Sequence, residues 1–72
     1  MPVIKLDSRR FQIFYRLYQG KTDRQIGQEL KLPGYTITYN KAQLFKILNV
    51  KKRAELPNLA RNFKIVLDCP IG

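Results

Sequence analysis

Apolar residues recur along the first third of the chain at the spacing of an α-helix. From Phe11 onward they fall about three or four positions apart, which is typical of the buried stripe of an amphipathic helix. The stripe consists of Phe11, Ile13, Phe14, Leu17 and Tyr18. Asp7 or Ser8 can cap the start of this helix, and Gly20 can end it because glycine adopts a left-handed conformation without strain. We therefore predict a first helix between these residues.

A second, shorter helix is predicted from its first turn. Thr22 and Gln25 stand at the spacing of a capping box, in which the hydroxyl accepts from a backbone amide and the glutamine side chain reaches back. The helix should run from about Asp23 to Lys31. Gly27 lies inside it, where glycine lowers helix stability. A close approach by another helix is one interpretation of this glycine, and neutral drift is another.

A third helix should follow a turn at Pro33 and Gly34, because these two residues together interrupt regular structure. It should run from about Tyr35 to Leu48, with Asn49 as its stop. Three apolar residues lie within about 40° of one another around its axis. They are Ile37, Leu44 and Leu48. These side chains should face the core, which leaves the opposite face exposed.

The fourth segment, residues 53–63, has the composition of a helix but contains Pro57. A helix that began at Arg53 would be kinked by this proline, because proline lacks the backbone N–H of an interior position. A helix that began at Glu55 or Leu56 would hold Pro57 in its first turn, where it is tolerated. The sequence leaves both alternatives open.

The predicted organisation is an all-α domain of four helices over residues 1–63, followed by a tail over residues 64–72. The tail contains the run Lys-Ile-Val-Leu, whose β-branched residues favour a strand. A short strand and a flexible end are the two alternatives for it.

Positive charge dominates the composition of this small domain. In 72 residues, 14 Lys and Arg residues oppose 5 Asp and Glu residues, so the net charge is +9. Such a balance favours a polyanionic partner: nucleic acid first, an anionic membrane surface second and an acidic protein third. The chain has no apolar run of the roughly 20 residues that span a bilayer, and no signal-peptide pattern. We expect a cytoplasmic, nucleoid-associated protein without a membrane partner.

The composition also argues against several kinds of chemistry. Histidine is absent and Cys69 is the sole cysteine, so the chain can form neither an internal disulfide nor a thiolate and imidazole zinc site. Cys69 is interpreted as an incidental thiol. Paired carboxylates at a useful spacing and a phosphate-binding loop are also missing. We expect no enzymatic activity, no cofactor and no metal.

The capped short helix, the turn and the longer helix together predict a helix-turn-helix. The face of the third helix opposite the core carries Thr38, Tyr39, Ala42, Gln43 and Lys46. Amide, hydroxyl, methyl and ammonium groups of this kind suit the edges of bases and phosphates. A solvated face is the alternative, but such faces usually include carboxylates, and none occurs between Lys31 and Arg53. The pattern therefore favours a face that contacts DNA.

Several short motifs follow one another in a fixed order along the chain. They are Leu6, Ile13-Phe14, Leu17, Gln19-Gly20, Thr22 to Gly27, Leu30, Leu32, Thr36-Ile37, Leu44, Lys46, Leu48 to Val50 and Arg53 to Glu55. In this combination, the stretch from Leu6 to about Ala60 resembles the LuxR/GerE-type DNA-binding domain, a four-helix module of bacterial transcription regulators. The chain would be a divergent, stand-alone member of that family.

The resemblance implies roles for individual residues. The helix that starts at Thr36 would enter the major groove of DNA, and its base-facing side chains would be Thr38, Tyr39 and Ala42, with Gln43 alongside. The DNA backbone would be held by Thr22, Arg24, Thr36, Lys46, Lys51 and Lys52. The fourth helix would pair two domains on DNA through Leu56 and Leu59.

The chain also departs from the family. Members usually carry an acidic residue early in the first helix, where this chain has Arg10 and Gln12. Arg16 replaces an apolar residue of that helix. Pro33 replaces a serine that often caps the third helix, so that Gly34 is expected to serve as a weaker cap.

Two functional hypotheses follow. The first is a sequence-specific DNA-binding transcription regulator that acts as a homodimer. The alternative is a protein-interaction module that binds RNA polymerase or another regulator, with Tyr15, Arg16 and Tyr18 of the first helix as its contacts.

Overall fold

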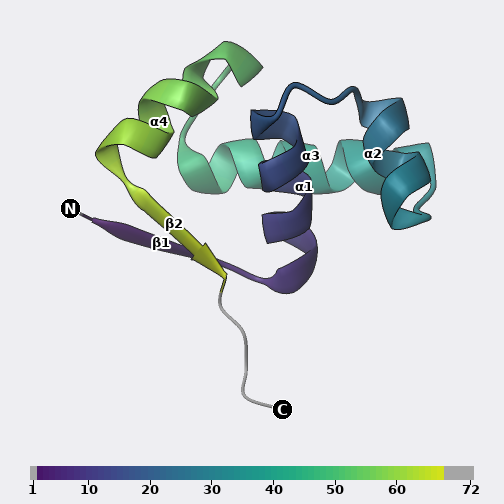
Figure 1. The fold of residues 1–72 in the computed structure, drawn as a ribbon, viewed down its shortest axis with the longest axis horizontal. Coiled ribbons are helices and arrows are strands. Elements are labelled where there is room, and N and C mark those ends of the chain that lie inside the picture. The colour runs from purple at the N-terminus through teal and green to yellow at the C-terminus, as the bar shows by residue number, and fades with distance from the viewer. Residues whose placement is uncertain (1, 68–72) are drawn as a thin grey trace.

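The computed structural model describes residues 2–67, and within them the chain forms four α-helices, one 3-10 turn and two short strands (Figure 1). In chain order these are β1 (Val3–Leu6), α1 (Ser8–Tyr18), α2 (Asp23–Leu30), α3 (Gly34–Leu48), η1 (Arg53–Glu55), α4 (Leu56–Asn62) and β2 (Lys64–Leu67). The four predicted helices are confirmed, and the molecule is mostly helical. Cys69 lies outside the described residues.

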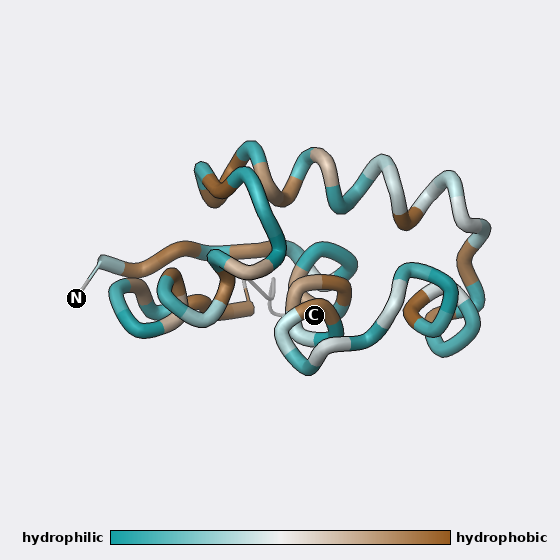
Figure 2. The backbone as a smooth tube through the Cα atoms, turned by 90° about the horizontal axis from the view of Figure 1, so that it is seen from above, coloured by the Kyte–Doolittle hydropathy of each residue, from teal (hydrophilic) through white to brown (hydrophobic). Residues whose placement is uncertain are grey.

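The longest helix, α3, lies along one side of the molecule. Figure 1 shows α1 crossing it, with α2 near one of its ends and α4 near the other, and Figure 2 shows all three lying to the same side of α3. The opposite flank of α3 is therefore left uncovered by other helices. This flank carries the residues that the sequence places on the DNA-contacting face.

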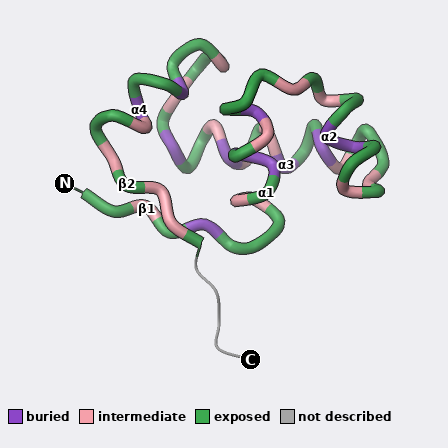
Figure 3. The backbone as a smooth tube through the Cα atoms, in the orientation of Figure 1, coloured by how far each residue is buried: buried purple, intermediate pink, exposed green. Residues whose placement is uncertain are grey.

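A single apolar core lies between the helices. It contains the side chains predicted to face inward from the first and third helices except Tyr18, and it extends to β1 and α4 (Figure 3). The prediction was wrong for Tyr18, which is 48% exposed at the end of α1. Its buried members are Leu6, Ile13, Phe14, Leu17, Ile26, Ile37, Leu44, Leu48, Leu56 and Leu59. Asn40 is the buried polar residue among the described ones, and its amide donates to the carbonyl oxygen of Thr36 at 2.7 Å.

The ends of the first two helices agree with the sequence interpretation. Asp7 occupies the N-cap of α1, although its side chain makes no capping hydrogen bond. Gly20 follows α1 with a φ of +93°, a conformation that favours glycine. At the start of α2, Thr22 and Gln25 form both hydrogen bonds of the capping box.

The start of α3 differs from the expectation that Gly34 would cap it. Pro33 is the N-cap residue, with extended backbone angles (φ −63°, ψ 154°), and Gly34 is already the first helical residue. The fixed φ of proline suits this extended conformation. The carbonyl oxygen of Pro33 accepts from the amides of Thr36 and Ile37, which closes the first turn without a side-chain cap.

The ambiguity at Pro57 is resolved by the short turn η1. The 3-10 turn covers Arg53–Glu55, and α4 begins only at Leu56, so that Pro57 lies in the first turn of the helix. An amide there has no partner within the helix, so the missing N–H costs little.

The two strands form a small parallel sheet that the all-α prediction did not include. Val3 pairs with Lys64 and Leu6 pairs with Leu67. Of the two alternatives for the tail, residues 64–67 form the strand. This strand is hydrogen-bonded to β1, and its Ile65 packs against the core. No helix of residues 2–67 is both long and apolar enough to cross a membrane.

Candidate nucleic-acid interface

The turn between α2 and α3 brings the two helices together. Lys31 ends α2 in the left-handed conformation (φ 57°), and the amide of Leu32 donates back to the carbonyl oxygen of Gly27 at 2.9 Å. Ile26 of α2 and Ile37 of α3 are both fully buried in the core. The short turn and these contacts fix the orientation of α3 relative to the start of α2, which is the arrangement of a helix-turn-helix.

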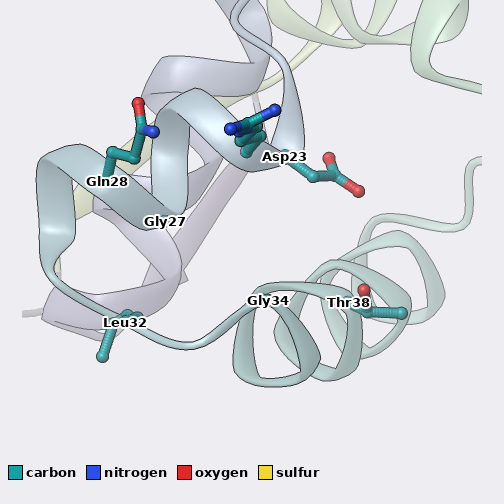
Figure 4. Close-up of a pocket in the computed structure, with 7 residues that line it drawn as sticks. Asp23, Gly27, Gln28, Leu32, Gly34 and Thr38 are labelled. Carbon is teal, nitrogen blue, oxygen red and sulfur yellow. The ribbon is translucent and has the colours of Figure 1, made fainter.

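A shallow groove separates α2 from α3 on the outer surface of this unit. Figure 4 shows Asp23 and Gln28 on the α2 side and Thr38 on the α3 side. The groove is lined by Asp23, Arg24, Gly27, Gln28, Leu32, Gly34 and Thr38. The negative charge of Asp23 in this groove is paired, because Nζ of Lys41 on α3 lies 3.3 Å from its carboxylate. This ion pair leaves the exposed Arg24 as the cation at the mouth of the groove.

The uncovered flank of α3 carries most of the predicted base-facing residues. Thr38, Tyr39, Ala42 and Lys46 are exposed, and Tyr39 has an exposed fraction of 61%. A large aromatic side chain that is so exposed gains little from packing within the protein. The opposite face, with Ile37, Leu44 and Leu48, is buried as the pattern predicts.

Gln43 differs from its neighbours on this flank because it is half-buried and hydrogen-bonded at both ends of its amide. Its Oε1 accepts from Nη2 of Arg10 at 3.0 Å, and its Nε2 donates to the hydroxyl of Tyr39 at 3.0 Å. In the sequence, Arg10 stands out only as a departure from the family, and no pattern connects it with α3. The available signal was the unusual positive charge in the first helix. The neighbouring residues do not identify its partner, which lies 33 positions away.

The family model GerE, which describes the bacterial regulatory proteins of the luxR family, matches residues 5–60. The chain belongs to this family. No curated protein and no solved structure matches the chain. The family consists of DNA-binding regulatory domains rather than enzymes, and DNA is the partner that it indicates.

In this luxR-family domain, the residues predicted to hold the DNA backbone lie at three places. Thr22 and Arg24 stand at the start of α2, Thr36 and Lys46 lie on α3, and Lys51 and Lys52 lie in the loop after it. The hydroxyl of Thr22 is already engaged, because it accepts from the backbone amide of Gln25 at 3.2 Å.

The loop after α3 is held by Glu55. Its Oε2 accepts from the backbone amides of Lys52, at 2.7 Å, and Lys51, at 2.5 Å. These two hydrogen bonds lower the pKa of the Glu55 carboxyl below its usual value, with that from Lys52 the stronger cause. The lysine backbones are thereby fixed, while both lysine side chains are exposed.

The structure does not support the pairing surface predicted for α4. Leu56 is 1% exposed and Leu59 is 8% exposed, because both pack into the core of their own domain. A buried side chain cannot at the same time form the centre of a dimer contact. The exposed residues of α4 are instead Pro57, Asn58, Arg61 and Asn62.

Of the three residues on α1 predicted to contact a protein partner, one is engaged within the domain and two are exposed. Arg16 lies 2.8 Å from the carboxylate of Glu29 on α2 and also donates to Gln12, so it holds α1 and α2 together. Tyr15 and Tyr18 are about half exposed, at 51% and 48%. They border an apolar groove that continues over Phe11, Phe14, Phe63 and Ile65.

Proposed function

We propose that this domain is a sequence-specific DNA-binding transcription regulator that reads the major groove with residues 36–48 of α3. The observation that supports this function most is the uncovered flank of α3, with an exposed tyrosine and polar side chains and no carboxylate. The major groove is wide enough to admit an α-helix and shows a different pattern of donors and acceptors for each base pair.

The assigned roles follow from exposure and chemistry. Thr38, Tyr39 and Ala42 are exposed along one flank and face the bases, with Gln43 alongside. The phosphates are contacted from the start of α2, from α3 and from the loop after it, by Thr22, Arg24, Thr36, Lys46, Lys51 and Lys52. Phosphate contacts provide affinity and fix orientation, whereas base contacts provide the choice of sequence.

A homodimer on a two-fold DNA site is part of this proposal. Since Leu56 and Leu59 are buried, the contact between two copies would use the exposed side of α4, where Asn58 and Arg61 lie. A regulator of this kind would act in the cytoplasm, at the nucleoid.

The proposal is tested by selecting bound fragments from a random double-stranded DNA pool and measuring their affinity as a function of salt. A recovered sequence motif, with an affinity that falls steeply as salt rises, supports it. Thr38→Ala should reduce the discrimination between the motif and single-base variants by about 1–3 kcal/mol if its contact is a good one.

The phosphate contacts are tested with Lys51→Gln and Lys52→Gln. Each change should weaken binding to all sequences equally. It should also lower the slope of log affinity against log salt concentration by about one, which corresponds to one released counterion. Lys64→Gln on β2 is the matched control, because it removes the same charge outside the proposed interface. Recovery of no motif from the pool, at low salt as well, contradicts the proposed function.

A second candidate, a protein-interaction module, is favoured by the apolar groove beside Tyr15 and Tyr18. Half-exposed aromatic side chains next to an apolar groove are typical of contact surfaces for proteins. RNA polymerase or another regulator would be the partner. Binding of purified bacterial RNA polymerase that is lost on Tyr18→Ser, in a protein that selects no DNA motif, would favour this candidate over the first.

A further inference from the structure

A line of hydrogen-bonded side chains connects the start of α1 with the exposed flank of α3. Asp7 lies 3.1 Å from Nη1 of Arg10, and Nη2 of Arg10 donates to Oε1 of Gln43 at 3.0 Å. Nε2 of Gln43 then donates to the hydroxyl oxygen of Tyr39 at 3.0 Å. Arg10 and Gln43 are 33 positions apart in the sequence, so the fold alone brings them together.

The direction of every hydrogen bond in this line is set by Arg10. A guanidinium group has donors and no acceptor, so the end of the Gln43 amide that faces it must be the oxygen. The NH2 end therefore faces Tyr39. Since an NH2 group can only donate, the tyrosine oxygen must accept, and its own proton is left to donate elsewhere.

The Tyr39 hydroxyl keeps its proton available for an acceptor outside the domain. Within residues 2–67 no hydrogen bond has this hydroxyl as its donor, and the residue is 61% exposed. Asp7 binds the other side of the guanidinium, and the Arg10 side chain is only 28% exposed. Both features restrict the position of Arg10. A fixed donor on a rigid helix is suited to recognising an acceptor atom.

We propose that Arg10 is a positioning residue that acts through Gln43 to present Tyr39 as a hydrogen-bond donor to an acceptor on a base edge. In the major groove such acceptors are N7 of purines, O6 of guanine and O4 of thymine. Gln43 is then a support for the reading side chain rather than a reader itself. This inference rests on the proposed function and names the side chain that makes one of its base contacts.

A carboxylate at position 10 should reverse the donor and acceptor roles in the hydrogen bonds of Gln43 and Tyr39. A carboxylate only accepts, so it would draw the NH2 end of Gln43 toward itself and turn Oε1 toward Tyr39. Tyr39 would then donate to Gln43 and present its lone pairs to DNA. The preferred partner would change from an acceptor to a donor, such as the amino groups of adenine or cytosine.

The experiment is selection from a random DNA pool with the unaltered protein and four variants. The variants are Tyr39→Phe, Arg10→Glu, Arg10→Met and the control Arg9→Glu. Arg9→Glu introduces the same charge change one position away, at an exposed residue. It should weaken binding without changing the preferred bases. Circular dichroism and thermal melting show which variants remain folded. If Arg10→Glu does not fold, Arg10→Met tests the role of Arg10 in its place.

We expect one base-pair position at which Tyr39→Phe and Arg10→Met each reduce discrimination by about tenfold. At that position Arg10→Glu should change the preferred base, and Arg9→Glu should not. An unchanged preference with Tyr39→Phe, or equal effects of the Arg10→Glu and Arg9→Glu changes, would overturn the inference while the proposed function stands. If the unaltered protein selects no motif, both fail.

A measurement without DNA tests the line itself. The side-chain NH2 group of Gln43 gives two resonances in a nitrogen–proton correlation spectrum, and hydrogen bonding at either end of the amide shifts them. We expect Tyr39→Phe and Arg10→Met each to shift these resonances and Arg9→Glu to leave them in place. Resonances that no substitution shifts would overturn the inference whatever the DNA result.

Discussion

Gly27 and Leu32 approach each other so closely that a Cβ at position 27 would be tightly packed against the Leu32 backbone. A Cβ placed on Gly27 would lie 3.0 Å from the carbonyl oxygen of Leu32 and 3.6 Å from Cγ1 of Ile37. The backbone after α2 turns back over this glycine, and the Leu32 amide is bonded to the Gly27 carbonyl oxygen. A close approach does occur at Gly27, but it is made by the backbone of the turn after α2 and not by another helix, since Ile37 of α3 lies at an ordinary contact distance.

Gly27→Ala should therefore destabilise the protein, although alanine is the better helix former. Helix propensity alone predicts a gain of about 1 kcal/mol, whereas the new methyl group would push the Leu32 carbonyl away from α2. We expect a lower melting temperature and a lower free energy of unfolding in urea. Gln28→Ala, at the exposed neighbouring position, is the control and should be neutral or stabilising. A more stable Gly27→Ala protein would show that the turn relaxes at no cost.

Arg53 joins the end of α1 to the turn before α4. Its guanidinium donates to the carbonyl oxygen of Leu17 at 3.1 and 3.3 Å and also to that of Lys21. Arg53→Met keeps much of the side-chain volume but leaves these carbonyl groups without their donor. We expect a loss of roughly 1–3 kcal/mol in the free energy of unfolding.

The control for Arg53 is Arg61→Met on the exposed side of α4. Arg61 makes one long hydrogen bond, at 3.5 Å, to Asn58, and its loss should change stability by no more than about 0.5 kcal/mol. Chemical denaturation of the three proteins at one pH gives the comparison. Equal stabilities for the two variants would mean that the Leu17 and Lys21 carbonyl groups find water instead.

The parallel sheet ties residues 64–67 to the N-terminal strand. A chain of residues 1–63 lacks β2, so it loses the pairing with β1 and the contact of Ile65 with the core. We expect it to be less stable than a chain of residues 1–67, which contains every described element. Melting curves of the two chains, beside that of the whole protein, test this. Identical curves for 1–63 and 1–67 would mean that the sheet adds nothing to the fold.

The sequence was sufficient for features whose cause is local. Three such features depend on residues only a few positions apart. They are the helical spacing of the apolar residues Phe14 and Leu17, the capping box at Thr22 and the left-handed turn at Gly20. The exposed face of α3 could be predicted for the same reason, because Ile37 and Leu44 mark the opposite side.

Features that depend on distant partners were missed or left open. The strand β1 has only four residues, and its partner β2 is nearly the whole chain away, so neither segment carries a pattern that identifies the other. Leu56 and Leu59 have the spacing of an apolar stripe, but a stripe does not say whether it faces its own core or another copy. The contact of Arg10 with Gln43 is invisible for the same reason.

Two glutamate side chains should govern how the fold responds to acid. Glu29 accepts hydrogen bonds from Lys21 at 2.5 Å and from Arg16 at 2.8 Å, and these lower the pKa of its carboxyl below the usual value of 4.5, with Lys21 the larger cause. The pKa of Glu55 is lowered by two backbone amides. A carboxyl with a lowered pKa stabilises the fold while it is ionised. That contribution is present above the usual value and is lost as the pH falls through the folded-state pKa.

We therefore expect the free energy of unfolding to fall as the pH drops below about 4.5, and to fall less steeply in Glu29→Gln and in Glu55→Gln. Salt should separate the two residues. The ion pairs of Glu29 are exposed and are screened by added salt, whereas Glu55 is held by backbone amides that carry no net charge. Urea titrations at pH 7 and at pH 3, in low and in high salt, should show the Glu29 contribution shrinking with salt and the Glu55 contribution persisting. Equal acid dependence in all three proteins would mean that neither carboxylate contributes to the stability of the fold.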